Sequence, residues 1–253
     1  MSNLSQYELE VSQAYNEAND YETLAEKLNK LMDNENSVAI YHLGTLYENG
    51  NGVEQDNHNA LSHYILADKM GLPQAKYQMG ITCEFGRCGV GQSYEVAAKI
   101  YKEASDLGHS GAQCQLGGLY ERGYGVEQSH ETAAHYYKLA AKNGNATATF
   151  LLADCYMNGI GVIKSVTEAL NLHHQAAQLG NGNSQLILSV KYKHGDDLPV
   201  DYVKAYKYAN LASSSASSDS DKEAAIGLRD EIFALMSDDE KKAILLLLNP
   251  TKD

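Results

Sequence analysis

The sequence has little proline, no tryptophan and no long apolar run. Three prolines in 253 residues leave long stretches free to be helical, because proline breaks a helix from within. The longest wholly apolar run, Ala243 to Leu248, is far shorter than the roughly 18 residues that indicate a membrane-spanning helix. The first ten residues, MSNLSQYELE, contain neither the basic nor the apolar stretch of a secretion signal. We therefore expect a helical protein of the cytoplasm, with no insertion into a membrane.

Basic residues are fewer than acidic ones. The chain has 20 Lys and Arg against 33 Asp and Glu, and a net charge of −13, which argues against a nucleic-acid partner. Residues 1–38 hold eight acids and two bases, and residues 219–253 hold nine acids and five bases. The middle of the chain is therefore nearly neutral. Acidic ends around a neutral middle are typical of a repeat array with solvated caps.

The sequence repeats itself with a step of 36 or 37 residues. Small residues recur at fixed places, and one such register holds Ala39, Ala75, Ala112, Ala148 and Ser184. A second register holds Ala60, Ala97, Ala133, Ala169 and Ala205. The single step of 37 residues coincides with a loop that is one residue longer, Gly86-Arg87-Cys88-Gly89. Repetition at this period indicates a solenoid built from small helical units.

Each unit has the pattern of two helices joined by a glycine-rich turn. Ala39, Leu43 and Tyr47 fall on one face of a first helix. Gly50 ends that helix and supplies the left-handed conformation that the turn needs, and a second helix begins near His58. Tyrosines are expected to fill the space between the helices at one repeated position, occupied by Tyr64, Tyr101, Tyr137, His173 and Ala209.

This pattern resembles the Sel1-like repeat, a relative of the tetratricopeptide repeat. The signature of the first helix and its turn appears as Ala39, Leu43-Gly44, Leu46-Tyr47, Gly50, Gly52 and Val53. It returns as Ala112, Leu116-Gly117, Leu119-Tyr120, Gly123, Gly125 and Val126. The later copies depart from it, since Ala153 and Ser189 replace the signature glycine and Gly195-Asp196-Asp197-Leu198 replaces the fifth turn. The resemblance implies an all-α fold, a right-handed α-solenoid of about five helix-turn-helix repeats with N- and C-terminal helical caps.

The repeats divide the chain into seven parts. These are an N-terminal cap, five repeats and C-terminal capping helices, with boundaries at 1–38, 39–74, 75–111, 112–147, 148–183, 184–220 and 221–253.

The two caps carry helix patterns of their own. At the N-terminus, Leu24, Leu28 and Leu31 predict a helix over 20–33, and its partner helix would be lined by Tyr7, Val11 and Tyr15. At the C-terminus, Ser237 and Glu240 predict a reciprocally capped helix start. We expect its Leu245 to Leu248 run to pack on the last repeat, and the Ser/Asp-rich insertion from Ser213 to Ser220 to be a mobile loop.

Reactive side chains are not spaced for catalysis or metal binding. Cys83, Cys114 and Cys155 stand where other repeats have core residues, so we expect buried fillers, whereas Cys88 in the longer loop is expected to be the exposed thiol. None of the nine histidines are paired at i and i+4. We predict no catalytic residue, no metal ligand and no cofactor. A cysteine-rich branch of the resembled family has been ascribed hydrolase activity, but the second helices here contain no cysteine, so a hydrolase is only a remote alternative.

The candidate site is the face formed by the first helices of the repeats. Two positions in each unit escape the core pattern, and the predicted groove residues are His42, Thr45, Gln78, Ile81, Gln115, Leu151, Asp154 and Ile187, with Arg122 nearby. The groove would be polar at the first repeats and more apolar towards the last. A plain solvated face is the alternative interpretation.

The resemblance implies a non-enzymatic adaptor, because Sel1-like proteins commonly bring other proteins together. The leading hypothesis is a bacterial, cytoplasmic interaction protein that holds a partner peptide or domain in the groove. The alternative is an inhibitor or immunity-type protein that blocks a cognate toxin, motivated by the small build and the acidic balance. We expect a monomer whose partner is another protein.

Overall fold

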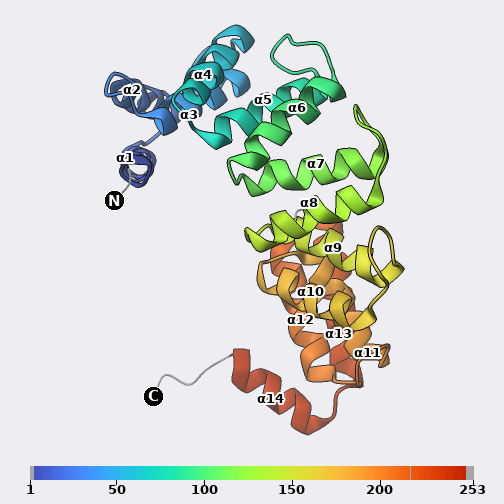
Figure 1. Ribbon diagram of the computed structural model, residues 1–253. Helices are drawn as coiled ribbons and strands as arrows, with labels where there is room; N and C mark the ends of the chain where they lie inside the picture. The colour runs from blue at the N-terminus through green and yellow to red at the C-terminus, as the bar shows by residue number, and fades with distance from the viewer. Residues whose placement is uncertain (1–2, 217, 249–253) are drawn as a thin grey trace. The chain divides into compact units, whose positions relative to one another are not determined.

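The computed structural model describes residues 3–216 and 218–248, which form fourteen helices and no strand (Figure 1). Their bounds are α1 Asn3–Glu17, α2 Tyr21–Met32, α3 Ser37–Asn49, α4 Asn57–Lys69, α5 Pro73–Phe85, α6 Tyr94–Asp106, α7 Ser110–Arg122, α8 His130–Lys142, α9 Ala146–Asn158, α10 Val166–Gln178, α11 Gly182–His194, α12 Tyr202–Ser215, α13 Asp219–Leu235 and α14 Asp238–Leu248. The predicted all-α repeat fold is confirmed.

The chain divides into two compact units, Met1–Tyr136 and Tyr137–Asp253, and each is described by itself. In the first unit α3 packs against α4, α5 against α6, and the next repeat joins through α4 with α5 and α6 with α7. In the second unit α9 packs against α10, α11 against α12, and α12 against α13. From α3 to α7 in the first unit and from α9 to α13 in the second, successive helices thus pack against one another, which is the organisation of a repeat protein.

Side-chain caps and glycines set the ends of the helices. The Asn36 side chain accepts a hydrogen bond from the Ala39 backbone N–H before α3, and Asn145 and Asn181 cap α9 and α11 in the same way. At the other end Gly50 has a φ of 69°, a left-handed conformation that costs glycine little. The boundaries of the repeated helices are therefore set by local residues.

In the first and third repeats the second glycine of the turn has a different role from the first. A Cβ added at Gly52 would lie 2.5 Å from the backbone nitrogen of Glu22, at the start of α2. Gly125 lies equally close to the start of α6. The turn of one repeat therefore rests on the second helix of the preceding unit. In the fifth copy Asp197 keeps the left-handed conformation, with a φ of 63° and its carboxylate 2.7 Å from the Lys191 ammonium.

The signature glycine inside the first helix makes room for the buried tyrosine. A Cβ added at Gly44 would lie 2.7 Å from the Tyr64 ring, and one at Gly80 would lie 2.5 Å from the Tyr101 ring. Both tyrosines are fully buried. In the fourth repeat Ala153 replaces the glycine and His173 replaces the tyrosine, and in the fifth repeat Ser189 and Ala209 do so. A larger residue at the glycine position therefore occurs together with a smaller side chain at the tyrosine position.

The structure corrects the prediction for Cys88. Its side chain is buried, 9% exposed, and packs with Ala60 and Tyr64. The longer loop takes a left-handed conformation at Cys88, with a φ of 53°, and this turns the side chain inward. Cys83 is the least buried of the four cysteines, whereas Cys114 and Cys155 are buried as expected.

The predicted extent of the loop, Ser213 to Ser220, is also wrong, because α12 and α13 take up residues at both of its ends. The helix α12 continues to Ser215, and the hydroxyls of Ser213 and Ser214 donate to the Asn210 carbonyl within it. Ser218 then caps α13 through the Asp221 backbone N–H at 3.1 Å. Residue 217 lies outside the described residues.

The two caps follow the sequence prediction with one exception. Val11 is buried against α2 as expected, but Tyr15 is 41% exposed. At the C-terminus the Ser237 backbone N–H donates to the Glu240 carboxylate, and the reciprocal bond returns to the Ser237 hydroxyl. Leu245 is exposed, and the side chains of residues 246–248 lie outside the described part of the chain, so packing of the Leu245 to Leu248 run stays a prediction.

Candidate functional site

The predicted groove residues lie on the first helices, and most are half-buried, as expected for the lining of a face. In the first unit these half-buried residues are His42, Thr45, Gln78, Ile81 and Gln115, and Arg122 is exposed. In the second unit they are Leu151, Asp154 and Ile187. Each unit therefore carries its own part of the predicted face.

Gln78 makes a contact between repeats that the sequence pattern did not predict. Its amide donates to the Glu48 carboxylate at 3.1 Å, and the Tyr64 hydroxyl donates to the same carboxylate oxygen at 2.6 Å. The other oxygen of Glu48 lies 3.9 Å from the Arg87 guanidinium. Glu48 thus joins the second helix of its own repeat to the first helix of the next.

The next repeat contains a related arrangement, in which the glutamine contacts the tyrosine instead of the glutamate. Tyr101 donates to the buried Glu84 carboxylate at 2.7 Å, and Gln115 hydrogen-bonds to Tyr101. Burial, followed by the bond to Glu84, raises the pKa of the Tyr101 hydroxyl, so it remains a donor. Gln78 and Gln115 therefore hold neighbouring repeats together. The recurrence of glutamate at Glu48 and Glu84 with the repeat step was the available signal, but its partners depend on how the repeats stack.

Two further predicted residues are partly satisfied within the chain. The Thr45 hydroxyl donates to the His42 carbonyl at 2.7 Å, and Ile81 packs against the core cluster formed around α6 and α7. Arg122 remains at the surface, with its guanidinium 5.4 Å from the centre of the Tyr124 ring.

In the second unit the face is shaped by a buried histidine. His173 replaces the tyrosine of earlier repeats and is 1% exposed, with its Nε2 3.9 Å from the Asp154 carboxylate. Burial, together with the charges of Lys191 and His174, lowers the pKa of His173 to about 4. The imidazole is therefore neutral at pH 7. Leu151 of α9 and Ile187 of α11 are half-buried apolar side chains on the first helices on either side of it in the chain.

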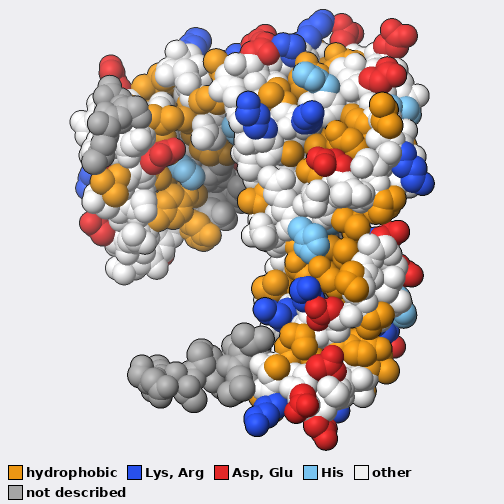
Figure 2. Space-filling model, turned by 60° about the horizontal axis from the view of Figure 1, so that its bottom comes forward, with side chains coloured by type: hydrophobic (Ala, Val, Ile, Leu, Met, Phe, Trp, Pro, Cys, Tyr) orange, Lys and Arg blue, Asp and Glu red, His pale blue; other side chains and the backbone are white. Residues whose placement is uncertain are grey.

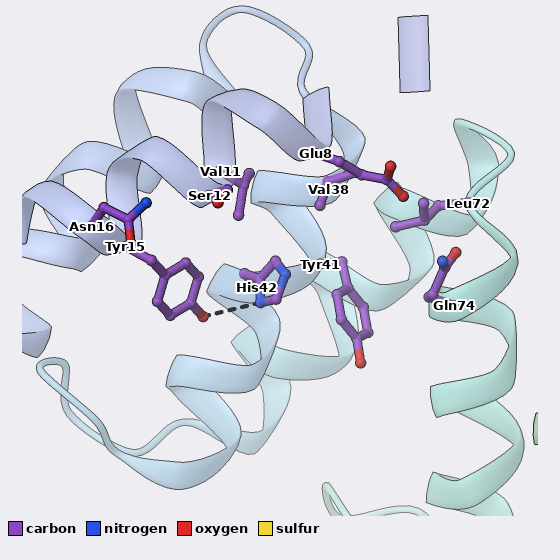
Figure 3. Close-up of a pocket in the computed structure, with 10 residues that line it drawn as sticks. All are labelled: Glu8, Val11, Ser12, Tyr15, Asn16, Val38, Tyr41, His42, Leu72 and Gln74. Atoms are coloured by element: carbon purple, nitrogen blue, oxygen red, sulfur yellow. Dashed lines mark hydrogen bonds between the residues drawn. The ribbon is translucent and has the colours of Figure 1, made fainter. Parts of the chain in front are cut away.

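A cleft lies at the N-terminal end of the face in the first unit, between α1, α3 and the start of α5 (Figure 3). Its volume is about 420 Å³. His42 forms part of the wall, and its Nδ1 lies 3.1 Å from the Tyr15 hydroxyl. His42 was predicted from the sequence as a site residue, but Tyr15 and Gln74 were not. The cap is too diverged to place α1 in the repeat register, so the sequence does not show that Tyr15 lies beside the face. We call this site the N-terminal cleft.

The surface offers little sign of other chemistry. Among the described residues no group of three or more His, Cys, Asp or Glu side chains could hold a metal ion. On the face drawn in Figure 2, acidic and basic side chains are interspersed, with no broad patch of one sign. No helix in the described part of the chain is long and apolar enough to cross a membrane.

The paired helices, glycine turns and buried tyrosines define a helical-repeat protein. The family model of the Sel1 repeat matches residues 37–71, 73–109, 110–145, 146–181 and 183–217. The chain therefore belongs to the Sel1 repeat family.

Solved structures of bacterial proteins are similar to this chain. A Sel1 repeat protein from Oxalobacter formigenes is 29% identical, with a TM-score of 0.73, over 78% of this chain and 80% of that one. A protective antigen of uropathogenic Escherichia coli is 25% identical, with a TM-score of 0.68, over 93% of this chain and 58% of that one. An immunity protein from Pseudomonas aeruginosa is 22% identical, with a TM-score of 0.56, over 90% of this chain and 82% of that one, a likeness that concerns the fold alone.

Proposed function

We propose that this chain is a non-enzymatic, bacterial and cytoplasmic interaction protein that holds a partner peptide or domain against the first helices of its repeats. The observation that supports it best is the N-terminal cleft, because it includes the predicted face residue His42 and is lined by side chains of the cap helix α1, of the first helix α3 and of the start of the first helix α5. Concave sites of this size with an apolar floor and a few polar groups are typical of binding. The fold supplies a scaffold, and the residues on its face supply specificity.

The state of the cysteines supports a non-enzymatic role. Burial raises the pKa of the Cys114 thiol to about 11 and also raises that of Cys83 and Cys88. A thiol must lose its proton to act as a nucleophile. These side chains therefore suit a packing role.

The inhibitor or immunity hypothesis uses the same face and differs only in the partner. It is favoured by the acidic balance of the chain, which would attract a basic partner. Co-expression with a toxin encoded beside this gene tests it, and a host that is still poisoned would contradict it.

Capture from a native extract tests the binding face. We would compare the wild-type chain with Thr45→Arg and Leu151→Arg on first helices, and with Leu66→Arg and Gln175→Arg on second helices. Thr45 and Leu151 are half-buried on the face, whereas Leu66 and Gln175 are exposed. The Thr45→Arg and Leu151→Arg variants should lose the partner, whereas the Leu66→Arg and Gln175→Arg variants should retain it. A partner retained by all four variants would contradict the proposal. Gln78 is unsuited to this test, because its substitution also disturbs the contact between repeats.

A further inference from the structure

The N-terminal cleft has an apolar floor. Val11 of α1, Val38 of α3 and Leu72 before α5 are all at least nine-tenths buried and line it. The half-buried Tyr41 ring stands between α3 and α5 (Figure 3). The floor is therefore the outer surface of the core of the cap, and an apolar side chain placed on it would remove further apolar area from water.

Two polar groups in the cleft have hydrogen-bonding capacity left. The Gln74 side-chain oxygen is buried and has no hydrogen-bond partner among the residues that the structure describes. A buried acceptor without a partner costs free energy, so rotation of the Gln74 side chain that brings this oxygen to an incoming N–H donor would be favoured. His42 is held by Tyr15 through Nδ1, and when Tyr15 donates this bond, Nε2 carries the proton and is a donor. In Figure 3 this second ring nitrogen points away from Tyr15.

The charge of the cleft is of one sign. Of the ten residues that line it, Glu8 alone carries a full charge, because burial lowers the pKa of His42 and keeps the imidazole neutral at pH 7. Glu8 is exposed at the rim. None of the other described residues that line the cleft opposes this charge, which favours a cationic group on the ligand.

We propose that the N-terminal cleft binds an extended peptide segment of the partner, with one large apolar side chain on the floor and a Lys or Arg beside it at Glu8. The backbone of the segment donates an N–H to Gln74 and accepts from His42 Nε2. The inference rests on the proposed function and deepens it, because it names the part of the face and the chemistry of the partner.

A phage-displayed library of random linear heptapeptides, selected on the purified full-length chain, tests this specificity. The enriched peptides should share a Leu, Ile, Met or Phe next to a Lys or Arg. Replacement of the apolar residue by Ala, or of the basic residue by Glu, should weaken binding of a synthetic copy at least tenfold. Enrichment of acidic peptides, or no enrichment, would overturn the proposal.

A matched pair of serines tests the location. Ser12 is exposed at the cleft on α1, and Ser62 is exposed on the second helix α4. Ser12→Arg should weaken the enriched peptide at least tenfold by filling the cleft and opposing the basic residue, whereas Ser62→Arg should leave binding unchanged. Glu8→Gln should remove the preference for Lys or Arg while keeping the apolar requirement. Equal binding to the Ser12 and Ser62 variants would overturn the assignment.

The same peptides separate this inference from the proposed function. Binding that survives Ser12→Arg but is lost in Leu151→Arg would refute the cleft and leave the first-helix face as the binding surface. Binding that no variant on the first helices affects would refute both.

Discussion

Replacing Gly80 with alanine tests the packing rule that the repeats share. An alanine Cβ at this position would lie 2.5 Å from the Tyr101 ring, closer than carbon atoms can approach. The ring cannot move aside, because Tyr101 is fully buried and its hydroxyl is bound to Glu84. In the fourth repeat, Ala153 and His173 stand at the positions of Gly80 and Tyr101. The chain therefore supplies its own compensating substitution, Tyr101→His.

The expected effect combines two opposing contributions. Overpacking a core costs about 1–3 kcal/mol, and alanine in a helix is favoured over glycine by roughly 1 kcal/mol. Because the clash is with an immobile ring, we expect Gly80→Ala to destabilise the chain by about 2 kcal/mol. In the Tyr101→His background the clash is relieved, so the same Gly80→Ala change should be neutral or stabilising by up to about 1 kcal/mol.

Urea unfolding followed by far-ultraviolet circular dichroism would measure the four free energies of this double-mutant cycle. Gly227→Ala is the control, because Gly227 is helical and an added Cβ there would meet nothing within 4 Å. That control should gain roughly 1 kcal/mol. The packing rule is refuted if Gly80→Ala is as harmless as Gly227→Ala, or if its cost is the same with and without Tyr101→His.

Three other predictions concern single residues. The pKa of His173 is about 4 in the folded chain and 6.5 ordinarily. The unfolded chain therefore takes up the proton first, and the free energy of unfolding should fall by up to about 3 kcal/mol as the pH drops from 6.5 to 4. Urea unfolding at both pH values should show a smaller fall for His173→Leu than for the wild type. Gly52→Ala should lower the free energy of unfolding by at least twice the roughly 1 kcal/mol expected for Gly71→Ala. Both glycines are left-handed, but an added Cβ meets the backbone of α2 only at Gly52. Equal melting temperatures of the two variants would be evidence against this contact. Ser237→Ala should cost about 1 kcal/mol by removing the cap of α14, measured by thermal unfolding.

The repeat fold could be predicted from sequence because its determinants are local. The helix ends are set by residues such as Asn36 and Gly50 within one turn of the boundary, and the period is visible in the chain itself. The inward position of Cys88 could not be predicted, because it depends on one left-handed residue in a loop that no other repeat contains.

The candidate face was predicted only in part. The spacing placed His42 and Gln78 on first helices, but it could not show that Gln78 binds Glu48 across a repeat boundary. That contact depends on the distance between stacked repeats, which a single unit does not encode. The N-terminal cleft escaped prediction for a related reason, since Tyr15 and Gln74 come from segments that share no repeat register.

Site-specific photo-crosslinking in the native cell would show whether the first-helix face binds the partner. A benzophenone amino acid would replace Thr45 or Ile187 on first helices, and Ser62 or Lys207, both exposed on second helices. If the first-helix face binds the partner, Thr45 and Ile187 should form adducts with the same partner protein, and Ser62 and Lys207 should form none. Adducts formed only from the second helices would contradict the claim that the first-helix face binds the partner.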